Sequence, residues 1–288
     1  MNTISLEPRR AQGGGDPTSV ESALRGETLY GDDFDPEQIR QWFEDEERGY
    51  FNLGAGDKDR YSYKYHALNQ RHAWRHLPER RYRRVLGFGS AYGDELRPIA
   101  ASADHITIME PADGFAVDRI AGTPVAYVKP RPDGLLPFAD GKFDLITAFA
   151  VLHHIPNVST VVAELSRCLS PEGFMLLREP IVSMGDWRKP RPGLTRRERG
   201  IPLSIFRRIL ETSGLTIMRE RLCAFSITSQ LAARWPVYSS RSVVWLDEWV
   251  SGLPLWPARY HATRMHEKLR PTAVAYVLRH RTRGPGSR

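Results

Sequence analysis

The fold of this chain is decided by the stretch from Val85 to Asp94, which reads Val-Leu-Gly-Phe-Gly-Ser-Ala-Tyr-Gly-Asp. Its apolar first residues predict a buried strand, and its glycines predict a tight turn that opens a helix. Gly89 and Gly93 would let the backbone lie against a bulky ligand where a Cβ atom would collide. A second apolar segment ends at Glu110, about 20 residues past the first glycines, where an acid binds ribose hydroxyls in nucleotide-binding βαβ units. The sequence therefore predicts a site for an adenosine-type cofactor.

Strand-like and helix-like segments alternate after this turn. Such alternation predicts an α/β fold, namely a Rossmann-like, doubly wound and mostly parallel sheet of seven strands with helices on both faces. The strands are expected at 84–88, 105–110, 125–128, 143–149, 173–178, 215–222 and 272–280, and the helices at about 91–101, 112–119, 158–169 and 203–213.

The chain outside the sheet divides into further regions. Its first residues are rich in Gly, Ser, Pro and charge, which is typical of disorder. Asp35 and Pro36 then form a good helix start, with an acid as cap and proline at the first position. The expected regions are a disordered tail at 1–30, an N-terminal helical cap at 31–79, the α/β core at 80–224 with its last strand at 271–282, and a Trp-rich insertion at 225–270 between the sixth and seventh strands.

Composition narrows the class of protein. The 288 residues carry a net charge of +7, and 41% of them are hydrophobic, as in ordinary soluble domains. Cys168 and Cys223 have no Cys or His partner at metal spacing, so we expect neither a disulfide framework nor a metal site. The N-terminus lacks the apolar core of a signal peptide, and no apolar run is long enough to span a bilayer. These features predict a cytoplasmic protein without a transmembrane segment.

Three motifs in order make the chain resemble the class I S-adenosylmethionine-dependent methyltransferases. The turn from Val85 to Gly93 resembles the glycine motif of this family, and Glu110 resembles the acid that ends its second strand. The segment from Leu136 to Ile155 contains Leu-Pro-Phe, Phe-Asp and Leu-His-His-Ile, and it resembles the signature of small-molecule methyltransferases. The resemblance covers the α/β core and implies S-adenosylmethionine as the cofactor.

The resemblance also implies which residues hold this cofactor. The glycine turn would stay open beside the methionine part, and Glu110 would accept both ribose hydroxyls. Asp133, in the loop after the third strand, would contact the adenine amino group. The cofactor-binding residues expected from the resemblance are Gly87, Gly89, Ala91, Gly93, Glu110, Asp133, Phe149, Ala150 and Val151.

The chain departs from the family at one position of the glycine motif. The family usually has an acid where Gly87 stands, at the end of the first strand. Its loss would weaken the grip on the amino group of the cofactor. We expect Asp94, or a side chain from the 61–77 segment, to replace it.

Methylation of a hydroxyl group requires a base, and histidine is the usual base near neutral pH. His153 and His154 follow the fourth strand, at the carboxyl edge where α/β sheets bind ligands. His66 is a further candidate. A purely structural role stays open for each of these three histidines.

Two features bear on the acceptor, which we expect to be a small molecule or a glycan methylated on oxygen. From Arg178 to Arg208 the chain has nine Lys or Arg and three Asp or Glu. This stretch is either a solvated basic face or a lid over an anionic acceptor. In the second case Trp187 would stack on a sugar, while Arg188, Lys189 and Arg191 would meet a phosphate or carboxylate.

Two other acceptors are alternatives. An RNA acceptor is favoured by the isoelectric point of about 9.5. It is disfavoured because residues 149–152 lack the Asn/Asp-Pro-Pro-aromatic tetrad of base methyltransferases, so we expect no nucleic-acid partner. A lipid-linked acceptor at a membrane would suit the tryptophans of the insertion, although core packing or a homodimer interface is the simpler reading. The tryptophans in question are Trp235, Trp245, Trp249 and Trp256.

Overall fold

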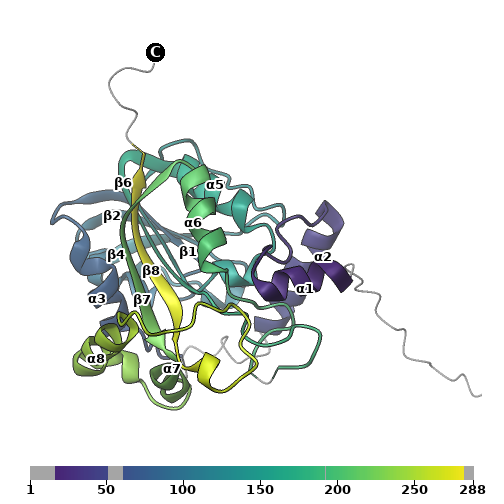
Figure 1. Ribbon diagram of the computed structural model, residues 1–288. Helices are drawn as coiled ribbons and strands as arrows, with labels where there is room; N and C mark the ends of the chain where they lie inside the picture. The colour runs from purple at the N-terminus through teal and green to yellow at the C-terminus, as the bar shows by residue number, and fades with distance from the viewer. Residues whose placement is uncertain (1–16, 51–60, 192, 282–288) are drawn as a thin grey trace, which may run out of the picture.

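The computed structural model describes residues 17–50, 61–191 and 193–281, and these form a twisted sheet with helices on both faces (Figure 1). The strands lie in the order β3-β4-β2-β1-β5-β6-β8-β7. Their bounds are β1 Tyr82–Phe88, β2 Ala103–Met109, β3 Arg119–Ile120, β4 Thr123–Val128, β5 Phe143–Phe149, β6 Leu169–Pro180, β7 Leu215–Phe225 and β8 Pro271–His280.

The sheet is mostly parallel, as expected. β4, β2, β1, β5 and β6 pair in parallel, whereas β8 runs antiparallel to both of its neighbours, β6 and β7. All seven expected strands are present. The additional strand, β3, is a two-residue edge strand that pairs antiparallel with β4.

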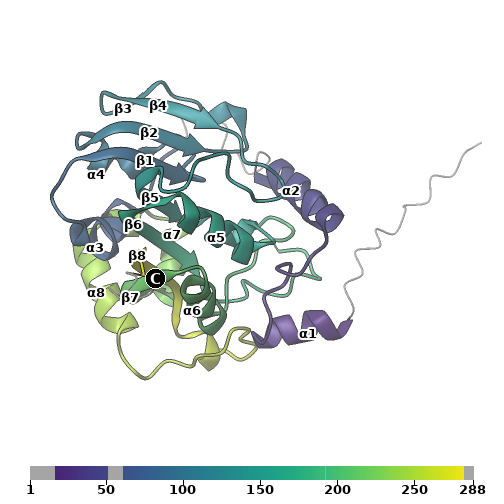
Figure 2. The same cartoon turned by 90° about the horizontal axis from the view of Figure 1, so that it is seen from above.

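Two of the four expected helices of the core are confirmed. α5 Val158–Cys168 and α6 Leu203–Thr212 cover one face of the sheet (Figure 2). The expected helix at 91–101 is wrong in extent, since it consists of a 3-10 turn at Asp94–Leu96 and the short α4 Arg97–Ala100. The expected helix at 112–119 is reduced to a 3-10 turn at Asp113–Phe115 with a glycine at its centre.

The N-terminal region is more ordered than expected. α1 spans Pro17–Arg25, so the predicted disordered tail is wrong over this helix, and residues 1–16 lie outside the described residues. α2 spans Pro36–Tyr50, and Asp35 caps it by accepting a 2.9 Å hydrogen bond from the backbone of Gln38. The fully buried Trp42 donates its Nε1 hydrogen to the carbonyl of His154 at 2.7 Å. This contact fixes α2 beside the loop that follows β5.

Helices α3 and α8 lie together on the face of the sheet opposite α5 and α6 (Figure 2), and α7 directly follows β7. α3 spans His66–His72, α7 spans Ser226–Ala232, and α8 spans Arg241–Ser251. Further 3-10 turns lie at Trp74–His76, Leu152–His154, Val237–Ser239 and His266–Lys268. Within the described chain, no helix has both the length and the apolar character that crossing a bilayer requires.

Three of the four tryptophans of the insertion are exposed. Trp235, Trp245 and Trp249 keep 54%, 58% and 60% of their surface in solvent. Core packing is therefore wrong for these three side chains. Trp256 does pack, against the ring of Phe225 at 4.6 Å.

Candidate functional site

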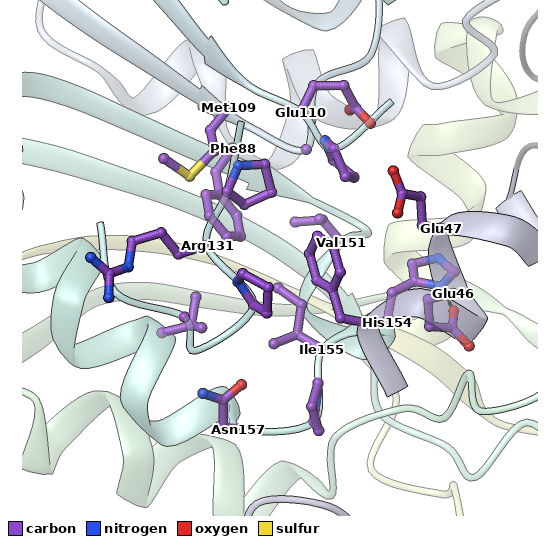
Figure 3. A pocket seen from close by; sticks show the side chains of 18 of the residues that line it. Glu46, Glu47, Phe88, Met109, Glu110, Arg131, Val151, His154, Ile155 and Asn157 are labelled. Carbon is purple, nitrogen blue, oxygen red and sulfur yellow. Dashed lines mark hydrogen bonds and ion pairs between the residues drawn. The ribbon is translucent and has the colours of Figure 1, made fainter. Parts of the chain in front are cut away.

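A pocket lies at the carboxyl ends of β1, β2 and β5, where α2 covers it (Figure 3). Its wall includes Gly89, Glu110 and Ala150, each of which directly follows one of these strands. Phe43, with two neighbouring glutamates of α2, closes one side. Ligands bind at this edge in open α/β sheets, so the position agrees with the sequence prediction.

The glycines of the turn have different tasks. Gly89 has a φ of +66°, and a Cβ there would lie 2.2 Å from Cγ2 of Val151, so its absence lets two walls of the pocket meet. A Cβ on Gly87 would lie 2.5 Å from Oγ of Ser90, and one on Gly93 would meet the side chain of Ile120. Gly87 and Gly93 therefore allow close packing under the turn. Both were expected to bind the cofactor, but neither lines the pocket.

Glu110 lines the pocket and is only 6% exposed. Its carboxylate accepts hydrogen bonds from the backbone nitrogens of Ala91 at 3.1 Å and Ala112 at 3.4 Å. Burial raises the pKa of Glu110 to about 7, although these two donors oppose the shift. Ala91, expected to touch the cofactor, instead orients the carboxylate of Glu110 and does not line the pocket.

The remaining expected cofactor residues separate into two groups. Ala150 and Val151 line the pocket. Phe149 does not, because its ring packs edge-to-face on Trp74 in the core. Asp133 is also outside the lining: its carboxylate pairs with Arg131 at 2.5 Å and caps the following turn. The expected contact of Asp133 with adenine is thus replaced by a role in shaping the loop.

Asn157 is a pocket residue that the sequence did not reveal. It lines the pocket, is 4% exposed, and donates from Nδ2 to the backbone oxygen of Asp133 at 2.8 Å. Its Oδ1 is buried without a hydrogen-bond partner among the residues described. Asn157 holds the N-cap position of α5 but makes no side-chain cap there. Because a buried amide oxygen costs about 1–3 kcal/mol when unpaired, this atom marks a position for a ligand donor.

Glu95 is the second residue that the sequence did not reveal. It is 4% exposed and accepts a 2.6 Å hydrogen bond from Oγ of Ser90, directly beside Gly87. Burial raises the pKa of Glu95 to about 7, against the opposing effect of the Ser90 hydroxyl. Asp94, the residue expected to replace the missing acid, pairs with Arg97 instead. Glu95 therefore supplies a buried carboxylate next to the position where the family acid is missing.

His153 and His154 are adjacent but have separate environments. His153 is buried between Glu179, 2.8 Å from Nδ1, and Glu198, 3.3 Å from Nε2. Burial alone would lower the pKa of His153, but these two carboxylates raise it to about 9. His153 is therefore cationic near neutral pH and unsuited to act as a base.

His154 is the expected catalytic histidine that lines the pocket (Figure 3). Its Nδ1 lies 2.8 Å from Oε2 of Glu46 in α2. Glu46 is itself held by the hydroxyl of Thr195 at 2.6 Å. His66, the third candidate, is exposed, contacts the ring of Tyr63 and does not line the pocket.

Among the described residues, one group has the composition of a metal site. His153, His154 and Glu198 each offer a ligand atom, all within 4.8 Å of one another. Each histidine of this group already contacts a carboxylate, and Glu198 already contacts His153. We therefore interpret the group as an ion-pair cluster that joins α2 to the loops following β5 and β6.

The basic segment after β6 is used mainly to hold itself together. Arg191 donates to four backbone carbonyls, those of residues 184, 195, 196 and 198. Arg188 pairs with Asp186 at 2.9 Å, and Trp187 stacks on Tyr30 at a centroid distance of 5.2 Å. Arg191 and Trp187 therefore contact the protein itself, whereas Arg188 and Lys189 are exposed, and the expected contacts of these residues with an anionic or sugar acceptor stay a prediction.

Comparisons with known proteins agree with this architecture. Residues 86–177 match the family described as "Methyltransferase domain". No curated protein matches the chain. A chain from the complex between the Haloferax volcanii Trm112 methyltransferase activator and a methyltransferase aligns with a TM-score of 0.52 at 13% identity, over 82% of this chain and 97% of its own. A SAM-dependent methyltransferase of Leishmania major aligns with a TM-score of 0.50 at 15% identity, over 85% of both chains.

Proposed function

We propose that this chain, whose residues 86–177 match a methyltransferase domain, is a class I S-adenosylmethionine-dependent methyltransferase that acts on a hydroxyl group of an uncharged small molecule or glycan in the pocket beneath α2. The observation that carries the proposal is that two groups able to accept hydrogen bonds from adenosine line the same pocket. Glu110 offers a carboxylate, and Asn157 offers an amide oxygen without a partner in the described chain. Adenosine has donors for both: the ribose hydroxyls and the exocyclic amine.

The residues present fit this cofactor. Glu110 would accept the ribose hydroxyls, and Oδ1 of Asn157 would accept from the adenine amine. Phe88, Met109 and Leu136 give the ring an apolar surface. Glu95 does not line the pocket itself, so we assign it the task of holding Ser90 at the position of the missing acid. When bound, the cofactor supplies an electrophilic methyl group on a sulfonium.

The acceptor side of the pocket is formed by α2 and His154. Glu46 accepts from Nδ1–H of His154, so in the neutral form of the ring the lone pair lies on Nε2. In this tautomer His154 can take the proton of an acceptor hydroxyl as it attacks. Holding the two reactants in line can lower the activation barrier of such a reaction by about 7–11 kcal/mol. We expect the walls of the pocket to hold them in this way.

The charges of the wall favour an uncharged acceptor. Three acids, Glu46, Glu47 and Glu110, face the pocket, against the single guanidinium of Arg131. An acceptor bearing phosphate or carboxylate would be repelled by these acids. A nucleic-acid acceptor is disfavoured for the same reason, despite the basic isoelectric point.

The test of this proposal is a comparison of variants on any hydroxyl acceptor that the wild-type protein methylates. His154→Ala should lower kcat by about 100-fold or more, since general base catalysis contributes 10²–10⁴-fold, and should leave cofactor affinity intact. Glu46→Gln should lower kcat less, because the tautomer of His154 is less firmly held. His66→Ala is the matched control and should retain full activity. An unchanged kcat for His154→Ala would contradict the assignment.

A further inference from the structure

Exposed apolar side chains are concentrated in the segment between β7 and β8. The described chain has eleven large hydrophobic side chains that are exposed, and all except Leu135 and Met218 lie between Ile227 and Leu269. Such a concentration on one part of a surface marks an interaction site more often than chance exposure does. None of these side chains takes part in the pocket described above, apart from Leu135 outside this segment.

Helix α8 presents the most prominent part of this surface. Trp245 and Trp249 are four residues apart, so they lie on the same helix face, and Leu246 beside them is 50% exposed. Arg241 extends the same stripe by one turn toward the N-terminus of the helix. We call Arg241, Trp245, Leu246 and Trp249 the α8 outer face.

The outward direction of this face is fixed from behind. Asp247, 1% exposed, accepts hydrogen bonds from the backbone nitrogens of Ala224 at 2.9 Å and Phe225 at 2.8 Å, and another from Thr228. Val244 is buried on the same inner side. Turning the tryptophans inward would break these contacts, so their exposure is a built feature of the fold.

The charges around α8 are predominantly positive. α8 contains two acids, the buried Asp247 described above and Glu248. Glu248 is paired with Arg71 and, at 3.7 Å, with Arg219. Arg75 also acts electrostatically on Glu248. Arg241 is exposed and has no ion pair among the described residues. The neighbourhood of the α8 outer face is therefore basic.

From this combination we propose that the α8 outer face docks on an anionic membrane surface. Tryptophan prefers the boundary between headgroups and acyl chains, and arginine beside it meets the phosphates. An arginine near an anionic leaflet is attracted by the negative surface potential of the lipids. α8 lies at the β7–β8 end of the sheet, away from α2 (Figure 2), so the docked protein would keep its pocket open to acceptors.

The experiment is flotation of the full chain with two kinds of vesicle, phosphatidylcholine alone and phosphatidylcholine mixed with an equal part of phosphatidylglycerol. The wild-type protein should float with the anionic vesicles and not with the neutral ones, and its tryptophan emission should shift to the blue. The double variant Trp245→Ser, Trp249→Ser should lose binding by about tenfold or more, because two large apolar side chains no longer enter the interface.

A charge pair provides the matched control. Arg241→Glu should weaken binding to anionic vesicles by about tenfold, whereas Arg208→Glu on α6, also exposed, makes the same change of net charge and should have little effect. Circular dichroism and binding of S-adenosylhomocysteine show that each variant is folded. The proposal is overturned if wild-type protein ignores anionic vesicles, or if both charge variants lose binding equally. It is also overturned if sedimentation shows a dimer that the tryptophan double variant disrupts, since the face then belongs to a second copy of the chain.

Discussion

At the scale of single residues, Asn157 offers the sharpest test of how the adenine ring is held. Replacing it by Ala should weaken binding of S-adenosylhomocysteine by about 1–2 kcal/mol, because the adenine amine loses its acceptor. The analogue S-inosylhomocysteine carries an oxygen in place of that amine. Wild-type protein should bind this analogue clearly more weakly than the natural product, and calorimetry on Asn157→Ala should find the two ligands much closer in affinity.

The inosyl analogue separates recognition from a purely structural role. Asn157 also ties its loop to the backbone of Asp133, so a general loosening of the pocket would weaken both ligands equally. Discrimination that is as strong in the variant as in the wild-type protein would remove Asn157 from the adenine site.

Glu110 and Asn157 also differ in what the sequence could reveal. Glu110 was predictable because a fixed spacing connects it to the glycine turn within one βαβ unit. Asn157 and Glu95 were not, because their roles arise from contacts between side chains and loops: Nδ2 of Asn157 donates to the loop before β5, and Glu95 accepts from the Ser90 hydroxyl that lies beside Gly87. Asp133 was expected in the adenine site, but its carboxylate forms an ion pair with Arg131, two residues away.

At the scale of elements, the cluster around His153 connects the loop after β5 to β6 and to the segment before α6. The pKa of His153 is raised from 6.5 to about 9, so its contribution to stability is complete below pH 6.5 and is lost as the pH rises through 9. The pKa of Glu198 is lowered to about 2, so its contribution is present above pH 4.5 and is lost only as the pH falls through 2. Together these shifts place the largest stabilisation between about pH 4.5 and 6.5.

The corresponding prediction compares urea unfolding of wild-type protein and His153→Gln across pH. The wild-type advantage should be largest near pH 6 and should shrink by roughly 3 kcal/mol at pH 10. Glu198→Gln provides a second variant if the first folds poorly. Chelators should not alter the wild-type curve if the cluster is an ion-pair group. Wild-type and variant curves that run parallel from pH 6 to pH 10 would show that His153 is not charged in the folded protein.

The strands and helices also show which parts of the secondary structure could be predicted from the sequence pattern. All seven expected strands are present, and those at the centre of the sheet were the most predictable because their buried segments, such as that of β5, are short apolar runs typical of parallel sheets. The helix expected at 91–101 failed because Pro98 allows a helix to begin only one residue before it, and the helix expected at 112–119 failed around Gly114. The order in residues 17–25 was missed because α1 is stabilised by tertiary contacts, such as those of the buried Ala23, and its own composition is polar.

At the scale of the whole molecule, two segments added to the sheet have different roles. The N-terminal helix α2 closes the pocket and brings Glu46 to His154, while the segment between β7 and β8 carries the exposed tryptophans. The pocket and the α8 outer face therefore belong to different additions and can be altered separately. Variants of the tryptophan face should leave cofactor affinity unchanged.

The central claim is that the pocket beneath α2 binds the cofactor, and calorimetric titration of S-adenosylmethionine and S-adenosylhomocysteine tests it most directly. We expect roughly micromolar affinity, about −8 kcal/mol, for the wild-type protein at pH 8. Glu110→Ala should weaken binding by about 1–3 kcal/mol, with Glu110→Gln in between, because the ribose hydroxyls lose their acceptor. Wild-type affinity should also fall below pH 7, as Glu110, with its pKa raised to about 7, becomes protonated. Folded protein that binds neither ligand, or a Glu110→Ala variant that binds as tightly as the wild type, would contradict the account.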